Sequence, residues 1–284
     1  MKQKSYFLRK LKNYLLTGIF ISTAFLVLIP LFSILVKLIS EGSSSVNMDF
    51  FTHLPKPVGE VGGGMANAIG GTLILIGIAC LIGLPIGIGT GICLSEYSNK
   101  QFASFIRFLT DVMSGIPSIV YGIFVYILIV KQMKSFSALA GGIALGIMMI
   151  PIITRTTEEV LKLVPNTLRE AALALGIPKW RTTLSIVLKT ASSGGLTGVM
   201  VSLARVAGET APLLFTALGN HFWNHGLLEP IAALPLQIFT YAIAPYDDWH
   251  RQAWAGALVL IAMVLFTNVI ARFVITRQFA ALKK

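Results

Sequence analysis

Long apolar runs separated by short polar segments are the dominant pattern of this chain. The first run, residues 14–39, follows a basic segment at 1–13. It exceeds the roughly 20 residues needed to cross a hydrocarbon core of about 30 Å. The pattern predicts an all-α membrane protein with six transmembrane helices. The other five lie at about 66–94, at about 105–130, at 137–153, within 190–219 and at about 254–275.

Two apolar stretches are interrupted in ways that change this picture. The third predicted span contains Ser-Gly-Ile-Pro-Ser at 114–118, which predicts a kink or an unwound turn. The run at 231–244 lies between Pro230 and Pro245 and is too short to cross a membrane. We therefore expect it to form a short or re-entrant helix at the membrane interface.

Three glycines recur at every fourth position of the second span, Gly83, Gly87 and Gly91. Small residues at this spacing let membrane helices approach closely. The stripe therefore predicts close helix packing rather than a ligand site, with a partner subunit as one candidate for the facing surface.

Composition supports the membrane assignment. The chain is 55% hydrophobic and only 12% charged, with a mean hydropathy of +0.78, whereas a soluble domain has about 25% charged residues. Cys80 and Cys93 fall in one apolar segment without the spacing of a metal site, so we expect packing residues and no disulfide.

The net charge of +11 is a topology signal. Most Lys and Arg residues fall on one side of the predicted spans, in 1–13, in the polar segment 154–190 and in 276–284. Basic loops remain in the cytoplasm. The distribution therefore predicts that both termini and the 154–190 segment are cytoplasmic, and it argues against nucleic-acid binding.

Two full charges, Arg205 and Glu209, lie inside the apolar fifth span. A charged side chain at a bilayer centre costs about 2.5–3.5 kcal/mol on insertion scales, so intramembrane charges usually mark a functional site. Four residues apart on a helix, the two side chains can pair. Gly208 and Pro212 predict a loosened turn beside them, because Pro212 has no N–H to donate. The combination points to a pathway for a polar solute.

Enzyme signatures are missing from the sequence. It has no GxxxxGK[ST] phosphate loop, no HExxH and no GxSxG. We therefore expect no cofactor and no metal, and the chain does not bind ATP through a phosphate loop of its own. The four histidines fall in predicted outer loops and are expected to be solvated or interfacial: His53, His221, His225 and His250.

The segment 154–190 contains a short predicted helix that Gly176 and Pro178 terminate. On composition alone, an interfacial amphipathic helix is the alternative. The spacing EAA-x3-G-x9-I-x-L resembles the EAA loop of ABC-importer permeases, with Lys189 where that family usually has Pro. The matching residues are Glu170, Ala171, Ala172, Gly176, Ile186 and Leu188.

Two further stretches resemble the permeases of phosphate importers, SGIPSIVYGIF at 114–124 and ARVAGETAPLLFT at 204–216. The resemblance implies a MetI-like core of five helices over 66–275, with a cytoplasmic coupling helix whose Glu170 contacts an ATPase subunit. It also implies a substrate pathway at Arg205, Glu209 and Thr210.

The resemblance further implies a location and partners. The location is the bacterial cytoplasmic (inner) membrane. The partners are a homologous permease, two ATP-binding subunits and an external phosphate-binding protein.

Several alternatives stay open at this point. Glu209 either parks Arg205 until phosphate displaces it, or forms a structural clamp with it that phosphate never touches. The substrate could instead be another oxyanion, molybdate or sulfate. An ATP-independent transporter or channel would leave the basic 154–190 segment unexplained, and an intramembrane enzyme would lack a nucleophile or a metal partner.

Overall fold

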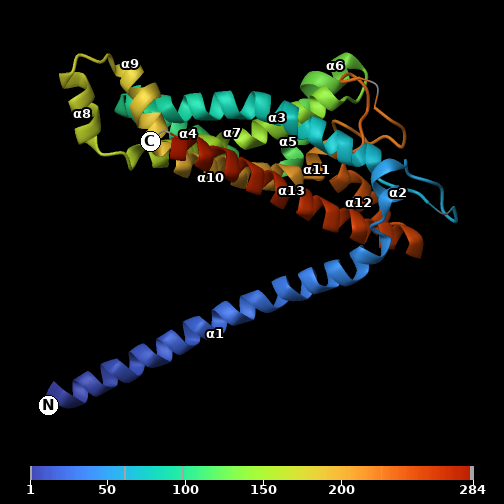
Figure 1. The fold of residues 1–284 in the computed structure, drawn as a ribbon, viewed down its shortest axis with the longest axis horizontal. Coiled ribbons are helices and arrows are strands. Elements are labelled where there is room, and N and C mark those ends of the chain that lie inside the picture. Colours follow the sequence, from blue (N-terminus) through green and yellow to red (C-terminus); the bar gives the residue numbers. More distant parts are fainter. Residues whose placement is uncertain (1, 61, 98, 225, 282–284) are drawn as a thin grey trace.

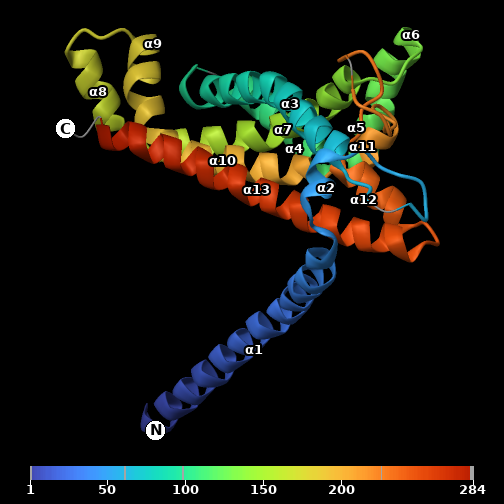
Figure 2. The same cartoon turned by 45° about the vertical axis from the view of Figure 1, so that its right-hand side comes forward.

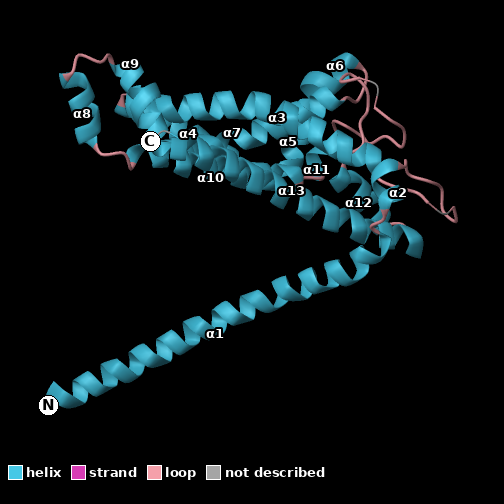
Figure 3. Cartoon of the chain, in the orientation of Figure 1, coloured by secondary structure: helices cyan, strands magenta, loops and turns pink. Residues whose placement is uncertain are grey.

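The structure, a computed structural model, describes residues 2–60, 62–97, 99–224 and 226–281. His225 and parts of both predicted terminal segments lie outside these residues. Helices joined by loops make up the described residues, which contain no strand (Figure 3), so the predicted all-α class is confirmed. Within the described residues, five helices are long and apolar enough to cross a membrane, and a bent pair gives a sixth span if its two helices are counted as one. They are α1 (Lys2–Gly42), α3 (Ala66–Ile92), α4 (Lys100–Gly115) with α5 (Ser118–Val125), α7 (Ala138–Lys162), α10 (Leu188–Ala207) and α13 (Asp247–Ala281).

Shorter helical elements connect these spans. They are α2 (Met48–Thr52), α6 (Lys131–Met133), α8 (Asn166–Ala174), α9 (Lys179–Thr182), α11 (Ala211–Leu214) and α12 (Leu234–Ala242). Single π-helical segments extend α3, α5 and α9 at Cys93–Tyr97, Tyr126–Val130 and Thr183–Val187. The run from Lys179 to Ala207 is one continuous span, so the helix after the EAA segment passes through Lys189 without a break.

Helix α7 is the centre of the bundle and packs against α3, α4, α5 and α10 (Figures 1 and 2). Its closest neighbour is α3, whose glycine stripe faces it. A Cβ on Gly87 would lie 2.7 Å from the Cβ of Ile153, and one on Gly91 would lie 2.6 Å from the Cβ of Thr157. The stripe is therefore occupied within the chain, and a partner subunit is not what it packs against.

Helix α7 continues beyond the predicted end of the fourth span. The charged residues after 153 favoured a loop, but the helix includes Pro151 and runs to Lys162. Glu158 is 1% exposed and accepts hydrogen bonds from Arg107 at 2.6 Å and Lys162 at 2.5 Å. Buried charges are tolerated when they are paired and hydrogen-bonded, so this segment stays in the bundle and the polar connection starts at 163.

Both predicted interruptions are confirmed. The bent pair α4 and α5 breaks at Ile116 and Pro117 and turns through 101°. Helix α12 is too short to cross a membrane and docks on its neighbours. The backbone N–H of Leu234 donates to Thr72 Oγ1 on α3 at 2.8 Å, and the Tyr241 ring stacks on Trp249 of α13 at 4.5 Å.

Helix α1 stands away from the bundle and meets it near the end of α1, where Gly42 lies against the Trp254 carbonyl of α13 (Figures 1 and 2). Most apolar side chains from Leu11 to Ile39 of α1 are exposed, whereas Leu38 is buried. The α8 and α9 hairpin lies at the same end of the bundle as the end of α13, whereas α2 and α12 lie at the other end (Figure 1). The fold thus separates the α8 and α9 hairpin from the loops at the α2 and α12 end by the length of the spans.

Candidate functional site

The first candidate site is the break at the end of α10. The fifth span was predicted within 190–219 with a loosened turn at Gly208 and Pro212, and the helix does end at Ala207 with Gly208 following it. The Gly208 N–H donates to the Arg205 carbonyl at 3.3 Å, and α11 begins shortly afterwards with Pro212 in its first turn. Arg205 therefore occupies the last helical turn, where the helix dipole stabilises a cation. Glu209 lies just beyond the helix.

The pair made by these two residues is loose. Arg205 Nε lies 3.8 Å from Glu209 Oε1, with side-chain exposures of 53% and 18%. N–H···O hydrogen bonds are normally 2.7–3.2 Å long, so the two groups attract without a hydrogen bond between them. The predicted proximity is confirmed, and the guanidinium retains exposed donors.

Thr210 anchors the broken segment to α12. Its hydroxyl donates to the Pro235 carbonyl at 3.4 Å, and its own carbonyl accepts from the N–H groups of Leu213 and Leu214. Its side-chain proton is therefore directed at the protein backbone rather than at Arg205.

The two breaks in the bundle pack on one another. A Cβ on Gly122 of α5 would lie 2.6 Å from the Pro212 Cα of α11, so the backbones touch. The Tyr121 hydroxyl donates to the Met113 carbonyl at 2.5 Å and braces the bend between α4 and α5. The stretches 114–124 and 204–216, far apart in sequence, thus form one unit beside Arg205.

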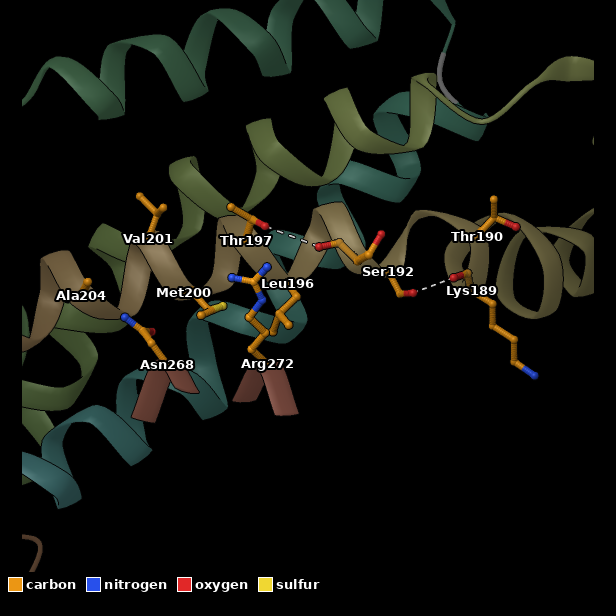
Figure 4. Close-up of a pocket in the computed structure, with 11 residues that line it drawn as sticks. Lys189, Thr190, Ser192, Leu196, Thr197, Met200, Val201, Ala204, Asn268 and Arg272 are labelled. Carbon is orange, nitrogen blue, oxygen red and sulfur yellow. Dashed lines mark hydrogen bonds between the residues drawn. The ribbon is translucent and has the colours of Figure 1, made fainter. Parts of the chain in front are cut away.

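A groove of about 670 Å³ runs along α10 toward this break and is closed on one side by α13 (Figure 4). Hydroxyl and amide groups and two cations line it, and none of its lining residues is acidic. Arg205 is not one of them, but it continues the ridge of Thr197 and Val201, since residues four apart share a helix face. The lining residues are Lys189, Thr190, Ser192, Ser193, Leu196, Thr197, Met200, Val201, Ala204, Asn268 and Arg272.

The second candidate site is α8, which lies away from the bundle (Figure 1). Glu170 and Ala171 are exposed, while Ala172 is 3% exposed and faces the protein. Among the described residues, no hydrogen bond or ion pair engages the Glu170 side chain. The apolar side chains of Leu173, Leu175 and Trp180 are exposed on the same hairpin, which leaves a carboxylate surrounded by an uncovered apolar surface.

The predicted end of this helix is confirmed. Gly176 has φ +76°, its N–H donates to the Leu173 carbonyl at 2.9 Å, and the Ile177 N–H donates to the Ala172 carbonyl at 3.1 Å. These two bonds form a Schellman motif, which favours glycine at its left-handed position. Pro178 follows as the N-cap residue of α9.

Sequence reasoning missed an ion pair behind α8. Arg169 binds Glu96, at the end of the α3 span, with Nη2 to Oε1 at 2.6 Å. In the sequence, Glu96 belongs to a short polar turn and Arg169 is one of many basic residues. The available signal was the acid directly after a long apolar run, because a carboxylate there needs a cation.

Sequence comparisons point to one family. Residues 83–280 match the family model of the binding-protein-dependent transport system inner membrane component. The phosphate transport system permease protein PstA of Yersinia pestis is 45% identical over 278 residues, 98% of this chain and 94% of that protein. The PstA of Haemophilus influenzae is 44% identical over 94% and 95%, and PstA 1 of Mycobacterium tuberculosis is 37% identical over 95% and 91%.

Solved structures share the fold. A bacterial alginate ABC transporter, in complex with a periplasmic protein holding an alginate pentasaccharide, aligns with a TM-score of 0.65 and 16% identity over 93% of this chain and 96% of that chain. An inward-facing MetNI methionine ABC transporter aligns with a TM-score of 0.57 and 16% identity over 75% and 94%. The expected importer-permease core is confirmed as a fold.

Proposed function

The chain belongs to the family of binding-protein-dependent transport system inner membrane components, and on that premise we propose that it is a permease subunit of an ABC importer that moves inorganic phosphate into the cytoplasm. Its relatives at 44–45% identity over nearly the whole chain carry the name of phosphate permeases. It is a multi-pass inner membrane protein and a transport subunit rather than an enzyme. ATP hydrolysis belongs to two separate ATP-binding subunits.

The observation that carries the phosphate assignment is the half-exposed Arg205 guanidinium at the broken end of α10. Its planar fork matches two phosphate oxygens with parallel hydrogen bonds. At 3.8 Å, Glu209 attracts the guanidinium without taking up its donors. A structural clamp would join two packed elements through short hydrogen bonds, whereas this pair spans a single turn. The geometry favours Glu209 as a resting partner that phosphate displaces.

The groove along α10 supplies the route between Arg205 and the end of the bundle that holds α8. A migrating oxyanion loses hydration, and Lys189, Arg272 and the hydroxyls replace part of it. The Ser192 and Thr197 hydroxyls donate to the Lys189 and Ser193 carbonyls of their own helix (Figure 4). Rotation about χ1 redirects these protons toward an anion, and the lining contains no carboxylate to repel it.

The hairpin of α8 supplies the contact with an ATPase subunit. Glu170 and the exposed Leu173 and Leu175 offer a charged and apolar surface on a short, rigid helix, and Gly176 fixes its angle to α9. This end of the bundle, with both chain ends, is assigned to the cytoplasm on the basis of its basic residues. A homologous permease completes the pathway, and an external phosphate-binding protein docks at the α2 and α12 end.

Transport by Arg205→Gln in the assembled importer tests the pathway. We expect uptake of labelled phosphate to fall at least about tenfold with unchanged membrane abundance, the size expected for losing a hydrogen bond to a charged group. Arg251→Gln, the same change at an exposed arginine paired with Asp248 on α13, is the matched control. Undiminished uptake by Arg205→Gln would refute the pathway role.

Competition identifies the anion. Phosphate and arsenate should compete for uptake, and sulfate and molybdate should not. The opposite order would assign the chain to another oxyanion importer.

Co-purification tests the coupling contact. Glu170→Lys should lose the ATP-binding subunits, whereas Glu60→Lys in the loop before α3 should retain them. If Glu170→Lys assembles and stimulates ATP hydrolysis like the parent, α8 is not the coupling helix.

A further inference from the structure

Arg169 is the most extensively bonded side chain on the coupling hairpin. Its Nε and Nη2 donate to the Glu96 carboxylate, and Nη2 also donates to the Leu161 carbonyl at 2.9 Å. Its Nη1 donates to the Val164 carbonyl at 2.6 Å and to Asn166 Oδ1 at 3.3 Å. All three guanidinium nitrogens are thus engaged. Arg169 therefore ties α8 to the end of α7 and to the end of the α3 span at one point.

The pair is sheltered from water. Glu96 is 5% exposed and Arg169 is 18% exposed. Charges withdrawn from water are tolerated only with good geometry and nearly complete hydrogen bonding, and both conditions hold here. Leu161 lies in the last turn of α7 and Val164 lies two residues beyond that helix, so Arg169 binds the backbone where α7 ends. This contact is therefore specific, unlike a surface ion pair.

Tyr97, the residue after Glu96, contacts α9, the second helix of the hairpin. The Lys179 ammonium at the start of α9 lies 4.8 Å from the centre of the Tyr97 ring. The Tyr97 hydroxyl lies 3.4 Å from Thr183 Oγ1. Consecutive residues of the π-helical segment Cys93–Tyr97 thus hold α8 on one side and α9 on the other.

We propose that Glu96 and Arg169 are positioning residues that set the orientation of the coupling helix α8 and carry its displacement into α3. This inference rests on the proposed coupling role of α8. The side of α8 that holds Arg169 and Ala172 faces the permease, while Glu170 faces outward. The helix is therefore attached to the bundle on the side opposite the proposed ATPase contact.

The packing of α3 determines where the displacement goes. Because α3 and α7 touch backbone to side chain along the glycine stripe, they move as one body. A push on α8 then reaches the bundle by two routes. One is the continuous span from Lys179 to Ala207, which leads to Arg205, and the other is the Glu96 contact, which leads to α3 and α7. Moving both together changes the groove without pulling α10 away from α7.

Measuring ATP hydrolysis and phosphate uptake in the same proteoliposomes tests the coupling claim. Glu96→Gln and Arg169→Gln should still co-purify with the ATP-binding subunits and hydrolyse ATP, while phosphate imported per ATP falls about tenfold, as expected for losing a buried hydrogen bond between charges. Glu60→Gln and Arg251→Gln, the same changes at exposed sites, should leave the ratio unchanged. An unchanged ratio in the Glu96 and Arg169 variants would overturn the proposal, as would loss of the ATP-binding subunits.

A second measurement does not depend on the substrate. Spin labels on Thr167→Cys in α8 and Gln101→Cys in α4, in full-length chains with Cys80→Ala and Cys93→Ala, report the orientation of α8 in the complex. The parent should give one narrow distance distribution and Glu96→Gln a broad one. Exchanging the charges, Glu96→Arg with Arg169→Glu, should narrow it again in part, since the two carbonyl bonds are not restored. If Glu96→Gln is as narrow as the parent, the pair does not position α8, even if the importer proves to carry a different anion.

Discussion

Two Arg–Glu pairs in this chain have the same chemistry and opposite geometry. Arg169 meets Glu96 at 2.6 Å in a largely buried position, and two backbone carbonyls and Asn166 Oδ1 take its remaining donors. Arg205 meets Glu209 at 3.8 Å while half exposed, and among the described residues it makes no hydrogen bond to that carboxylate. An arginine whose donors are all taken holds structure together, whereas one with donors to spare is available to a ligand. Under the proposals above, this difference separates a positioning arginine from an arginine of the transport pathway.

The largest expected difference between the two pairs is in stability. Arg169→Leu should lower the free energy of unfolding by about 3–5 kcal/mol, because it leaves the Glu96 carboxylate buried without its cationic partner. Arg205→Leu should lower it by no more than about 1 kcal/mol, the range for exposed pairs. Unfolding of the purified chain in mixed micelles with increasing dodecyl sulfate, followed by tryptophan fluorescence, measures both. Equal losses would remove the distinction between the pairs.

Neutralising the acid of the loose pair has an intermediate expected effect. Glu209→Gln should leave stability unchanged within about 1 kcal/mol and should strengthen phosphate retention by the purified complex about tenfold, because no carboxylate competes for Arg205. Uptake should fall, since release becomes slower. Equilibrium dialysis with labelled phosphate measures retention, with exposed Glu229→Gln as the control. Unchanged retention together with a large loss of stability would identify a structural clamp instead.

The smallest expected effect comes from the second attachment of the hairpin. Tyr97→Leu removes the ring that faces Lys179, a contact of about 0.5–1 kcal/mol, so phosphate imported per ATP should fall about two- to fivefold. Tyr97→Phe keeps the ring and loses only the hydroxyl contact with Thr183, so it should stay close to the parent. The same proteoliposome assay measures both. A larger loss in Tyr97→Phe than in Tyr97→Leu would contradict the assignment of this contact to the ring.

Local signals predicted the local features of this fold. Gly176 and Pro178 determine where α8 ends, and Pro117 marks the bend between α4 and α5, because backbone conformation at these positions depends on neighbours in the chain. The extension of α7 was missed because a charged residue such as Glu158 favours a loop when only the sequence is considered. Its pairing with Arg107 of α4 becomes visible only in the fold. The pairing of Glu96 with Arg169 joins residues 73 positions apart. Such contacts depend on the packing of the spans, which hydrophobic periodicity does not specify.

The π-helical segments at Cys93–Tyr97 and Thr183–Val187 lie where the hairpin attaches to the long spans. A π turn holds one more residue than an α turn, so the helix contains one extra residue at that point. Drawing that residue into regular α-helix rotates the helix beyond it by about 100° and advances it by about 1.5 Å. One such turn contains Glu96, and the other directly precedes α10. They allow a displacement of the hairpin to be converted into rotation of the spans about their own axes.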